Sequence, residues 1–207
     1  MKYEFVEGDT KVIAPGRTVK RIRALVAISY FVSAGSLGGY VEGVKNLEQS
    51  GDAWVYGNAW VYGDAWVYGD AQVSGNARVS GNAQVSGNAR VYGNAWVYGN
   101  AQVSGNARVS GNARVYGDAR VSGNARVYGD ALIVWFSHVG SENGTLTVYN
   151  TKDNALEVTR GCFRGSVDEF LTASENKHDD QTHLEYRMLI EVAYMRITRA
   201  REALGGL

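Results

Sequence analysis

Between residues 51 and 134, hydrophobic and polar positions recur with an unbroken period of six. Thirteen units have the form Gly-[Asn/Asp]-Ala-x-Val-[Tyr/Ser], where x is Trp, Gln or Arg. A fourteenth unit at 129–134 keeps the frame with Leu, Ile and Val, so the array covers 84 residues without an insertion. A period of six fits neither an α-helix nor a coiled coil, and it therefore predicts short strands.

The chemistry of each hexad predicts where its side chains point. Ala and Val are two positions apart, so in a strand they lie on the same side, and they are the apolar positions that recur. We expect them inside and the x and Tyr/Ser positions outside. Gly followed by Asn or Asp indicates a turn, since these residues tolerate positive φ best. Short strands that always turn in the same sense wind into a parallel β-helix.

The repeat resembles the hexapeptide pattern of left-handed β-helix proteins, in which an aliphatic residue recurs every six positions and a small residue precedes it by two. This resemblance implies left-handed winding with three hexads in each triangular coil, which for fourteen hexads gives between four and five coils. The expected fold class is mainly β: a single-stranded left-handed parallel β-helix with a small C-terminal α+β domain.

The flanking segments are expected to cap the β-helix, because open ends would expose unpaired strand edges. Residues 1–50 are predicted to form an N-terminal cap and irregular first coils, with β-type runs at Lys2–Val6 and Thr18–Leu25. Asn46-Leu47 fits the hexad frame before the array begins, and the apolar run Ala24–Val32 is interpreted as a buried strand or helix segment.

Residues 135–207 are predicted to form a β-β-β-α-α domain that follows the β-helix of residues 51–134. Ser166 and Glu169 have the spacing of a helix capping box, and the last helix is expected near residues 180–201. Strands are expected at Ile133–Ser137, Gly144–Tyr149 and Ala155–Thr159, and helical patterns at Val167, Phe170 and Leu171 and at Leu184, Met188, Leu189, Val192 and Met195.

Two short segments extend the resemblance beyond the array. Leu37–Tyr40 is a Leu-Gly-Gly-Tyr entry segment, and Gly161–Gly165 has the form Gly-Cys-Phe-x-Gly. With the array, they make the chain similar to the hexapeptide-repeat proteins of bacteriophages and prophages, the YdcK-like group. That resemblance implies a phage-type protein in the host cytoplasm, and it carries no activity over to named residues.

Composition limits the partners and the compartment that we expect for this protein. Lys plus Arg and Asp plus Glu are each 21, and this zero net charge argues against a protein that binds nucleic acid without regard to sequence, which requires a basic excess. We also expect no specific nucleic-acid partner. The apolar run of nine residues is too short to span a membrane, and a single cysteine suits a reducing compartment, so we expect a cytoplasmic protein. That cysteine, Cys162, lies beside Phe163 and is interpreted as a buried, inert thiol.

The array lacks the chemistry of β-helix enzymes. The acyltransferases of this fold use a histidine base, and its carbonic anhydrases hold zinc with three histidines, but residues 51–134 contain no His, Cys, Glu or Lys. The three histidines, His138, His178 and His183, follow the array. We therefore expect no catalytic residue, metal or cofactor, and a non-enzymatic protein with a structural or protein-binding surface. The alternatives are an inhibitor or small-ligand sponge acting on a host factor, and a diverged acyltransferase.

One side of the β-helix is the candidate interface. With eighteen residues per coil, indoles and guanidiniums alternate along it, and Trp, Tyr and Arg are enriched at interface hot spots. We expect a homotrimer, with a dimer as the runner-up, and a protein partner that could be a host factor. The alternative is that these side chains only support the stacked strands. The candidate residues are Trp60, Tyr62, Arg78, Trp96, Tyr98, Arg114 and Tyr116.

Overall fold

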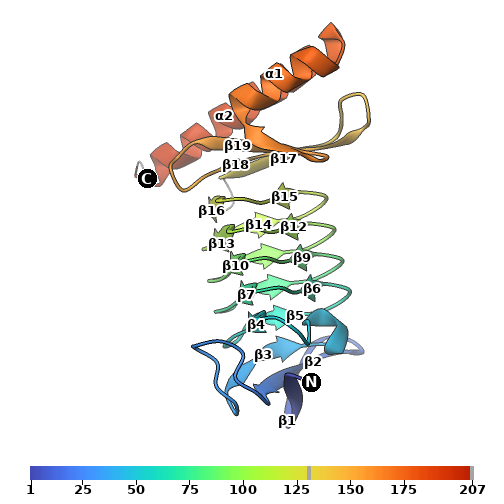
Figure 1. Cartoon of the computed structure of the whole chain (residues 1–207), viewed down its shortest axis with the longest axis vertical. Helices are drawn as coiled ribbons and strands as arrows, with labels where there is room; N and C mark the ends of the chain where they lie inside the picture. Colours follow the sequence, from blue (N-terminus) through green and yellow to red (C-terminus); the bar gives the residue numbers. More distant parts are fainter. Residues whose placement is uncertain (130–131, 206–207) are drawn as a thin grey trace.

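A computed structural model describes residues 1–129 and 132–205. Its centre is a stack of coils, with a β-hairpin at one end and a sheet covered by two helices at the other (Figure 1). Positions 130 and 131 of the fourteenth hexad lie outside the described residues.

The stack is a β-solenoid whose strands pair in parallel. Each array strand pairs with the strand eighteen residues further along, as in the pairs of Trp60 with Arg78 and Arg78 with Trp96. Three sheets result, and they form the sides of the solenoid. The strands are β4 (Trp54–Val55), β5 (Trp60–Val61), β6 (Trp66–Val67), β7 (Gln72–Val73), β8 (Arg78–Val79), β9 (Gln84–Val85), β10 (Arg90–Val91), β11 (Trp96–Val97), β12 (Gln102–Val103), β13 (Arg108–Ser110), β14 (Arg114–Val115), β15 (Arg120–Val121) and β16 (Arg126–Tyr128).

The interior and the corners of the solenoid follow the hexad pattern. Every array Ala from Ala53 to Ala125 and every array Val from Val55 to Val127 is fully buried. Each hexad glycine has a φ between +60° and +76°, the left-handed region that glycine enters without a steric cost. At the corners the Asn side chains hydrogen-bond from coil to coil, for example Asn82 Nδ2 to Asn100 Oδ1 at 3.0 Å.

The N-terminal cap is a β-hairpin that continues one side of the solenoid. Strands β1 (Tyr3–Ala14) and β2 (Arg17–Ala24) pair with each other, β2 pairs with β3 (Leu37–Val41), and β3 joins the array at β5. The apolar run Ala24–Val32 is not the buried strand or helix that we expected. It ends β2 and becomes a loop whose Tyr30 and Phe31 side chains are 95% and 80% exposed.

The entry coil is two residues longer than the coils above it. Tyr40 pairs with Trp60 and Leu47 with Val67, an offset of twenty residues in each case, so Leu47 takes the place of a Val rather than of an Ala. The two extra residues lie between Leu47 and Val55, which are eight positions apart, whereas the 3-10 helix η1 (Val44–Asn46) falls within the ordinary six-residue step from Val41 to Leu47.

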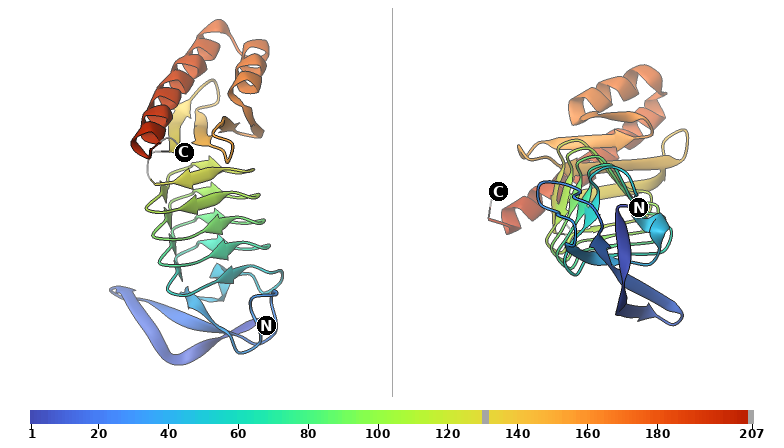
Figure 2. Two further views of the ribbon diagram at one scale, coloured as in Figure 1. Left: turned by 90° about the vertical axis from the view of Figure 1, so that its left-hand side faces the viewer. Right: turned by 60° about the horizontal axis from the view of Figure 1, so that its bottom comes forward.

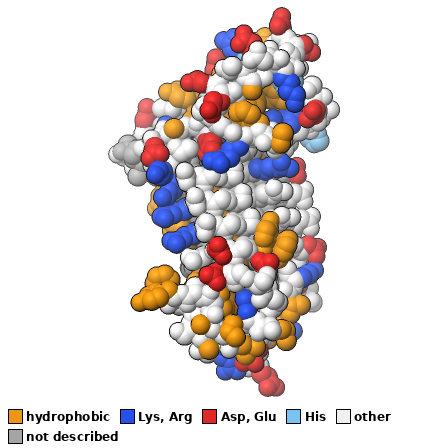
Figure 3. All heavy atoms as spheres, in the orientation of Figure 1, with side chains coloured by type: hydrophobic (Ala, Val, Ile, Leu, Met, Phe, Trp, Pro, Cys, Tyr) orange, Lys and Arg blue, Asp and Glu red, His pale blue; other side chains and the backbone are white. Residues whose placement is uncertain are grey.

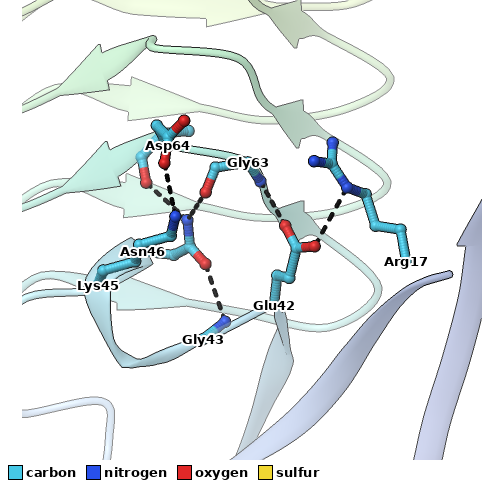
Figure 4. Close-up of polar contacts among 8 residues, drawn as sticks. Arg17, Glu42, Gly43, Lys45, Asn46, Gly63 and Asp64 are labelled. Atoms are coloured by element: carbon cyan, nitrogen blue, oxygen red, sulfur yellow. Dashed lines mark hydrogen bonds and ion pairs between the residues drawn. The ribbon is translucent and has the colours of Figure 1, made fainter.

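At the entry turn, side chains make hydrogen bonds to the Gly63 corner that the backbone of a preceding coil would otherwise make (Figure 4). Buried Asn46 donates to the carbonyls of Gly63 and Ala65 at 2.9 and 2.8 Å, and Glu42 accepts the Gly63 N–H at 2.6 Å. At the next corner, Glu48 accepts the Gly69 N–H, and this hydrogen bond lowers the pKa of the Glu48 carboxyl.

The C-terminal region is a four-stranded antiparallel sheet with helices on its outer face (Figure 2). The structure has one strand more than we predicted, because the turn at Gly161 and Cys162 is followed by a fourth strand. Its elements are β17 (Ile133–Val139), β18 (Gly144–Asn150), β19 (Leu156–Arg160), β20 (Phe163–Ser166), α1 (Val167–Lys177) and α2 (Asp180–Ala203). The capping box at Ser166 and Glu169 is present at the start of α1.

The two faces of this sheet have different partners. Tyr149 is fully buried against the solenoid core, and its hydroxyl lies 3.3 Å from Ser122 Oγ, whereas Leu146 and Val148 pack with the helices. Thr159 Oγ1 also donates to the Arg120 carbonyl at 2.9 Å. The sheet therefore closes the last coil of the solenoid.

A candidate interaction face on the solenoid

The candidate interface residues all lie on one side of the solenoid. We call this surface the Trp–Arg face: the column Trp60, Arg78, Trp96 and Arg114 with the flanking Tyr62, Tyr98 and Tyr116. The column is set by direct pairing of β5, β8, β11 and β14, which fixes the x positions of successive coils next to one another.

Indoles and guanidiniums alternate along the column, and Arg78 lies close to both neighbouring indoles. The Arg78 guanidinium carbon lies 4.6 Å from the Trp60 ring centroid and 6.0 Å from that of Trp96. Both distances are within the range of cation–π attraction. Trp96 Nε1 donates to Ser80 Oγ at 3.3 Å, so this indole is also held by the coil below.

The column and its flanking rings, which together we call the ladder, extend into the N-terminal cap. The sequence did not predict this extension. Tyr40 is the strand partner of Trp60 and is the first ring of the column. Lys11 Nζ and the Arg21 guanidinium lie 4.2 and 4.5 Å from its ring centroid. Tyr40 belongs to the Leu-Gly-Gly-Tyr segment, so the sequence did single out its location.

At the other end the ladder enters a hollow below the C-terminal sheet. Tyr98 and Tyr116 stack with centroids 4.9 Å apart, and Trp135 meets Tyr116 edge-on at 4.5 Å. The hollow has a volume of about 480 Å³, and Arg114 and Arg196 bring two cations to it. Its remaining lining residues are Ile133, Val134 and Phe136. Trp135 and Arg196 were not predicted, because no hexad frame links them to the array.

The other two sides of the solenoid differ from this face. Trp54, which we expected on the outside, is fully buried beneath the N-terminal hairpin, where Tyr3 meets it edge-on at 6.2 Å. A Cβ on Gly38 would lie 2.8 Å from the Trp54 ring, so the entry segment requires glycine there. On the third side, Trp66 is 40% exposed and stacks on Tyr68.

The side that begins with Trp54 continues as a column of arginines. Arg90 pairs with Arg108, and Arg108 with Arg126. Basic side chains stack over β10, β13 and β16 at the left edge of Figure 3. Among the described residues, no carboxylate forms an ion pair with any of the three.

A second cavity lies within the C-terminal region and holds about 380 Å³. Phe163, Phe170 and Tyr186 form its aromatic lining, Arg160 and Lys177 bring positive charge, and Glu142, 4.0 Å from Arg160 Nη1, brings one negative charge. Arg160 Nε donates to the Tyr186 hydroxyl at 3.0 Å.

Ser174 and Cys162 are two small side chains in the lining of this cavity. Ser174 lines it, is 3% exposed, and its hydroxyl has no hydrogen-bond partner among the described residues. Cys162 also lines it and is exposed, so the prediction of a buried thiol is wrong. The turn between β19 and β20 carries the cysteine out of the sheet.

The side chains that could bind a metal ion are not clustered in the part of the chain that the structure describes. Within residues 1–129 and 132–205, no three His, Cys, Asp or Glu side chains are close enough together to hold a metal ion. In the same residues, no helix is long and apolar enough to cross a membrane.

Comparison with known proteins agrees with the repeat geometry. The family described as YdcK Beta solenoid repeat matches the chain at residues 50–69, 71–83, 83–99, 101–117, 107–120, 113–129 and 119–134. No curated protein sequence matches the chain. From residue 50 to residue 134 the chain is therefore similar to the YdcK repeats, and the protein is a β-solenoid repeat protein.

Proposed function

We propose that this protein is a non-enzymatic scaffold of phage type that binds a protein partner through the Trp–Arg face and the hollow at its end. The carrying observation is the continuity of the ladder, which runs from Tyr40 in the N-terminal cap to Trp135 in the C-terminal sheet. We further propose left-handed winding with three hexads a coil, a count that agrees with the eighteen-residue register.

The chemistry of the face suits an acidic partner segment with apolar side chains. Arg78 and Arg114 are exposed, and Tyr116 is 41% exposed, while the indoles are half-buried by their neighbours. In the hollow, Arg114 and Arg196 would bind a carboxylate, and the rings of Tyr98, Tyr116 and Trp135 would contact its apolar neighbours. The partner could be a host factor in the cytoplasm or further copies of the chain, for which we propose a homotrimer with a dimer as runner-up.

A paired substitution tests this proposal. Trp96→Ser with Arg114→Gln alters the Trp–Arg face, and Gln84→Ser with Gln102→Ser is the matched change on the third side of the solenoid. The assays are affinity capture from lysate with mass spectrometry, light scattering, and thermal unfolding. The first pair should abolish partner capture, or self-assembly through the Trp–Arg face, while the melting transition persists, and the second pair should change neither.

Two results would contradict the proposal. Equal effects from both pairs would mean that the face has no special role in binding. Loss of folding in the first pair, without prior loss of binding, would mean that the ladder only stabilises the solenoid.

A second candidate function, binding of a small ligand, is supported by the cavity in the C-terminal region. Its aromatic lining, its Arg160 and Lys177 cations and the unpartnered Ser174 hydroxyl suit a small aromatic carboxylate. The probe is 3-phenylpropionate, and the readout is protection of the chain's single thiol, Cys162, from alkylation.

Two neighbouring positions of α1 provide the variant and its control. Ala173 lines the cavity and Thr172 does not, although both are exposed. Ala173→Trp should abolish protection by 3-phenylpropionate, and Thr172→Trp should leave it intact. Protection of equal strength by 3-phenyl-1-propanol would exclude carboxylate recognition, and no protection by either compound would exclude the site.

A further inference from the structure

Helix α2 has a second apolar face that nothing in the described chain covers. Its inner face, Tyr186, Ile190, Ala193 and Ile197, is at most 4% exposed against the C-terminal sheet and α1. On the opposite side, Leu184, Met188, Val192 and Met195 are 51%, 60%, 39% and 62% exposed. Their spacings of four, four and three residues place them in one stripe along the helix.

Charged side chains flank this stripe in a self-complementary order. Asp180, Arg187, Glu191 and Arg199 are exposed, and none forms an ion pair with another described residue. These four residues follow one another as acid, base, acid and base between residues 180 and 199, and the exposed Arg196 and Glu202 of α2 lie outside this alternation. Such an order matches its own reverse, because the first residue has the opposite charge to the last and the second to the third.

Antiparallel pairing of two α2 helices would use both the stripe and the charges. When Leu184 lies opposite the partner's Met195, the antiparallel register brings Met188 close to the partner's Val192. The same register places Asp180 opposite the partner's Arg199 and Arg187 within one residue of the partner's Glu191. Twofold symmetry repeats each of these contacts.

Parallel pairing would be unfavourable. It would place Arg187 beside the partner's Arg187 and Glu191 beside the partner's Glu191, and like charges at such positions repel. Assemblies with threefold symmetry about α2 would need parallel helices, so the charge order favours a twofold contact.

We propose that the outer face of α2 binds a second copy of this chain in an antiparallel, twofold-symmetric contact. This contact is separate from the Trp–Arg face, and it goes beyond the proposed binding function of that face. Apolar packing would supply affinity, and the ion pairs would set the orientation of the helices.

Light scattering and sedimentation of the full chain test the contact. The wild type should have twice the 22.5 kDa mass of the chain, or a higher multiple of two if the Trp–Arg face also assembles. Met188→Glu should raise the dissociation constant of the α2 contact at least tenfold. Tyr194→Glu, at an exposed position to one side of the stripe, is the matched control and should leave it within twofold. A wild type that stays monomeric at high micromolar concentration, or equal effects of the two variants, would overturn the proposal.

Charge reversal tests the register. Arg187→Glu and Glu191→Arg should each weaken the dimer, and the double variant should restore it to within about twofold of the wild type. A double variant as weak as the singles would overturn the antiparallel pairing. The Trp96→Ser/Arg114→Gln variant should retain the α2 contact, so failure of the two proposals can be told apart.

Cross-linking tests the orientation directly. In a Cys162→Ser background, a mixture of Leu184→Cys and Met195→Cys chains should form a mixed disulfide dimer on oxidation, and neither variant should cross-link efficiently alone. Self-cross-linking of each single variant would indicate parallel helices and would overturn the proposal.

Discussion

Replacing a corner glycine with alanine should cost more where the new Cβ would clash with the next coil than where it would fit against it. Gly99 and Gly57 both have positive φ, +71° and +60°. A Cβ on residue 99 would lie 2.9 Å from the Gly117 nitrogen, whereas a Cβ on residue 57 would have Gly75 O at 3.8 Å as its nearest neighbour. The two positions therefore share the conformational cost but not the steric one.

The magnitudes follow from these two contributions. An L-residue in the left-handed region costs about 1–2 kcal/mol, which applies to both variants. Overpacking adds about 1–3 kcal/mol at residue 99 only. Gly117 cannot easily move away, because its carbonyl accepts the Asn100 N–H at 2.9 Å. We expect a loss in the free energy of unfolding of about 1–2 kcal/mol for Gly57→Ala and about 2–5 kcal/mol for Gly99→Ala.

Equilibrium unfolding in urea, followed by tryptophan fluorescence, measures both losses. The assay is suitable because four of the five tryptophans lie in the array. Equal losses in the two variants would refute the steric argument, and they would mean that the stacked corners can separate at little cost.

Two further predictions concern charge and pH. Arg108→Gln removes like-charge contacts with Arg90 and Arg126 and should stabilise the fold by about 0.4–2 kcal/mol at low salt, whereas Arg78→Gln loses its contacts with two indoles and should destabilise it by about 0.5–2 kcal/mol. Urea unfolding at low and high salt checks both, and the same sign for the two variants would be contrary to this reasoning. Burial raises the pKa of Tyr3 to about 12. Between pH 10 and 12 the unfolded chain therefore binds fewer protons than the folded one, and the free energy of unfolding falls as pH rises, by up to about 1.4 kcal/mol per pH unit. Urea midpoints at pH 9 and 11 should differ less in Tyr3→Phe than in the wild type, and an unchanged difference would argue against this origin.

The solenoid could be predicted from the sequence because each hexad carries its own signals. Gly, Ala and Val determine the corner and the interior of every coil, and the sum of fourteen repeats leaves little ambiguity. The hexad pattern alone wrongly predicted an exposed Trp54. Its x position points outward from the array, but the N-terminal hairpin covers it. Contacts between distant segments leave no mark on a six-residue period.

Helix α2 shows a different limit of sequence analysis. Its outer stripe, with Leu184, Met188 and Met195, is the apolar pattern that reveals the helix, yet the opposite face is the one that packs. Both faces of α2 are apolar. The periodicity therefore predicts a helix, but it does not determine which face packs against the sheet. The hollow beside Arg114 was also not predictable, because Trp135 and Arg196 reach it from elements outside the array.

The eighteen-residue register makes the solenoid an adjustable spacer. Removing residues 75–92 would join Ser74 to Gly93 in frame, and every remaining residue would stay in its own column, with Trp60 then next to Trp96. The two ends of the molecule would then approach by about 4.8 Å, the distance between adjacent strands, without turning relative to each other. Removing a single hexad would instead rotate the C-terminal region onto the next side of the solenoid. The number of hexads therefore sets both the separation of the two ends and the direction in which the C-terminal region faces.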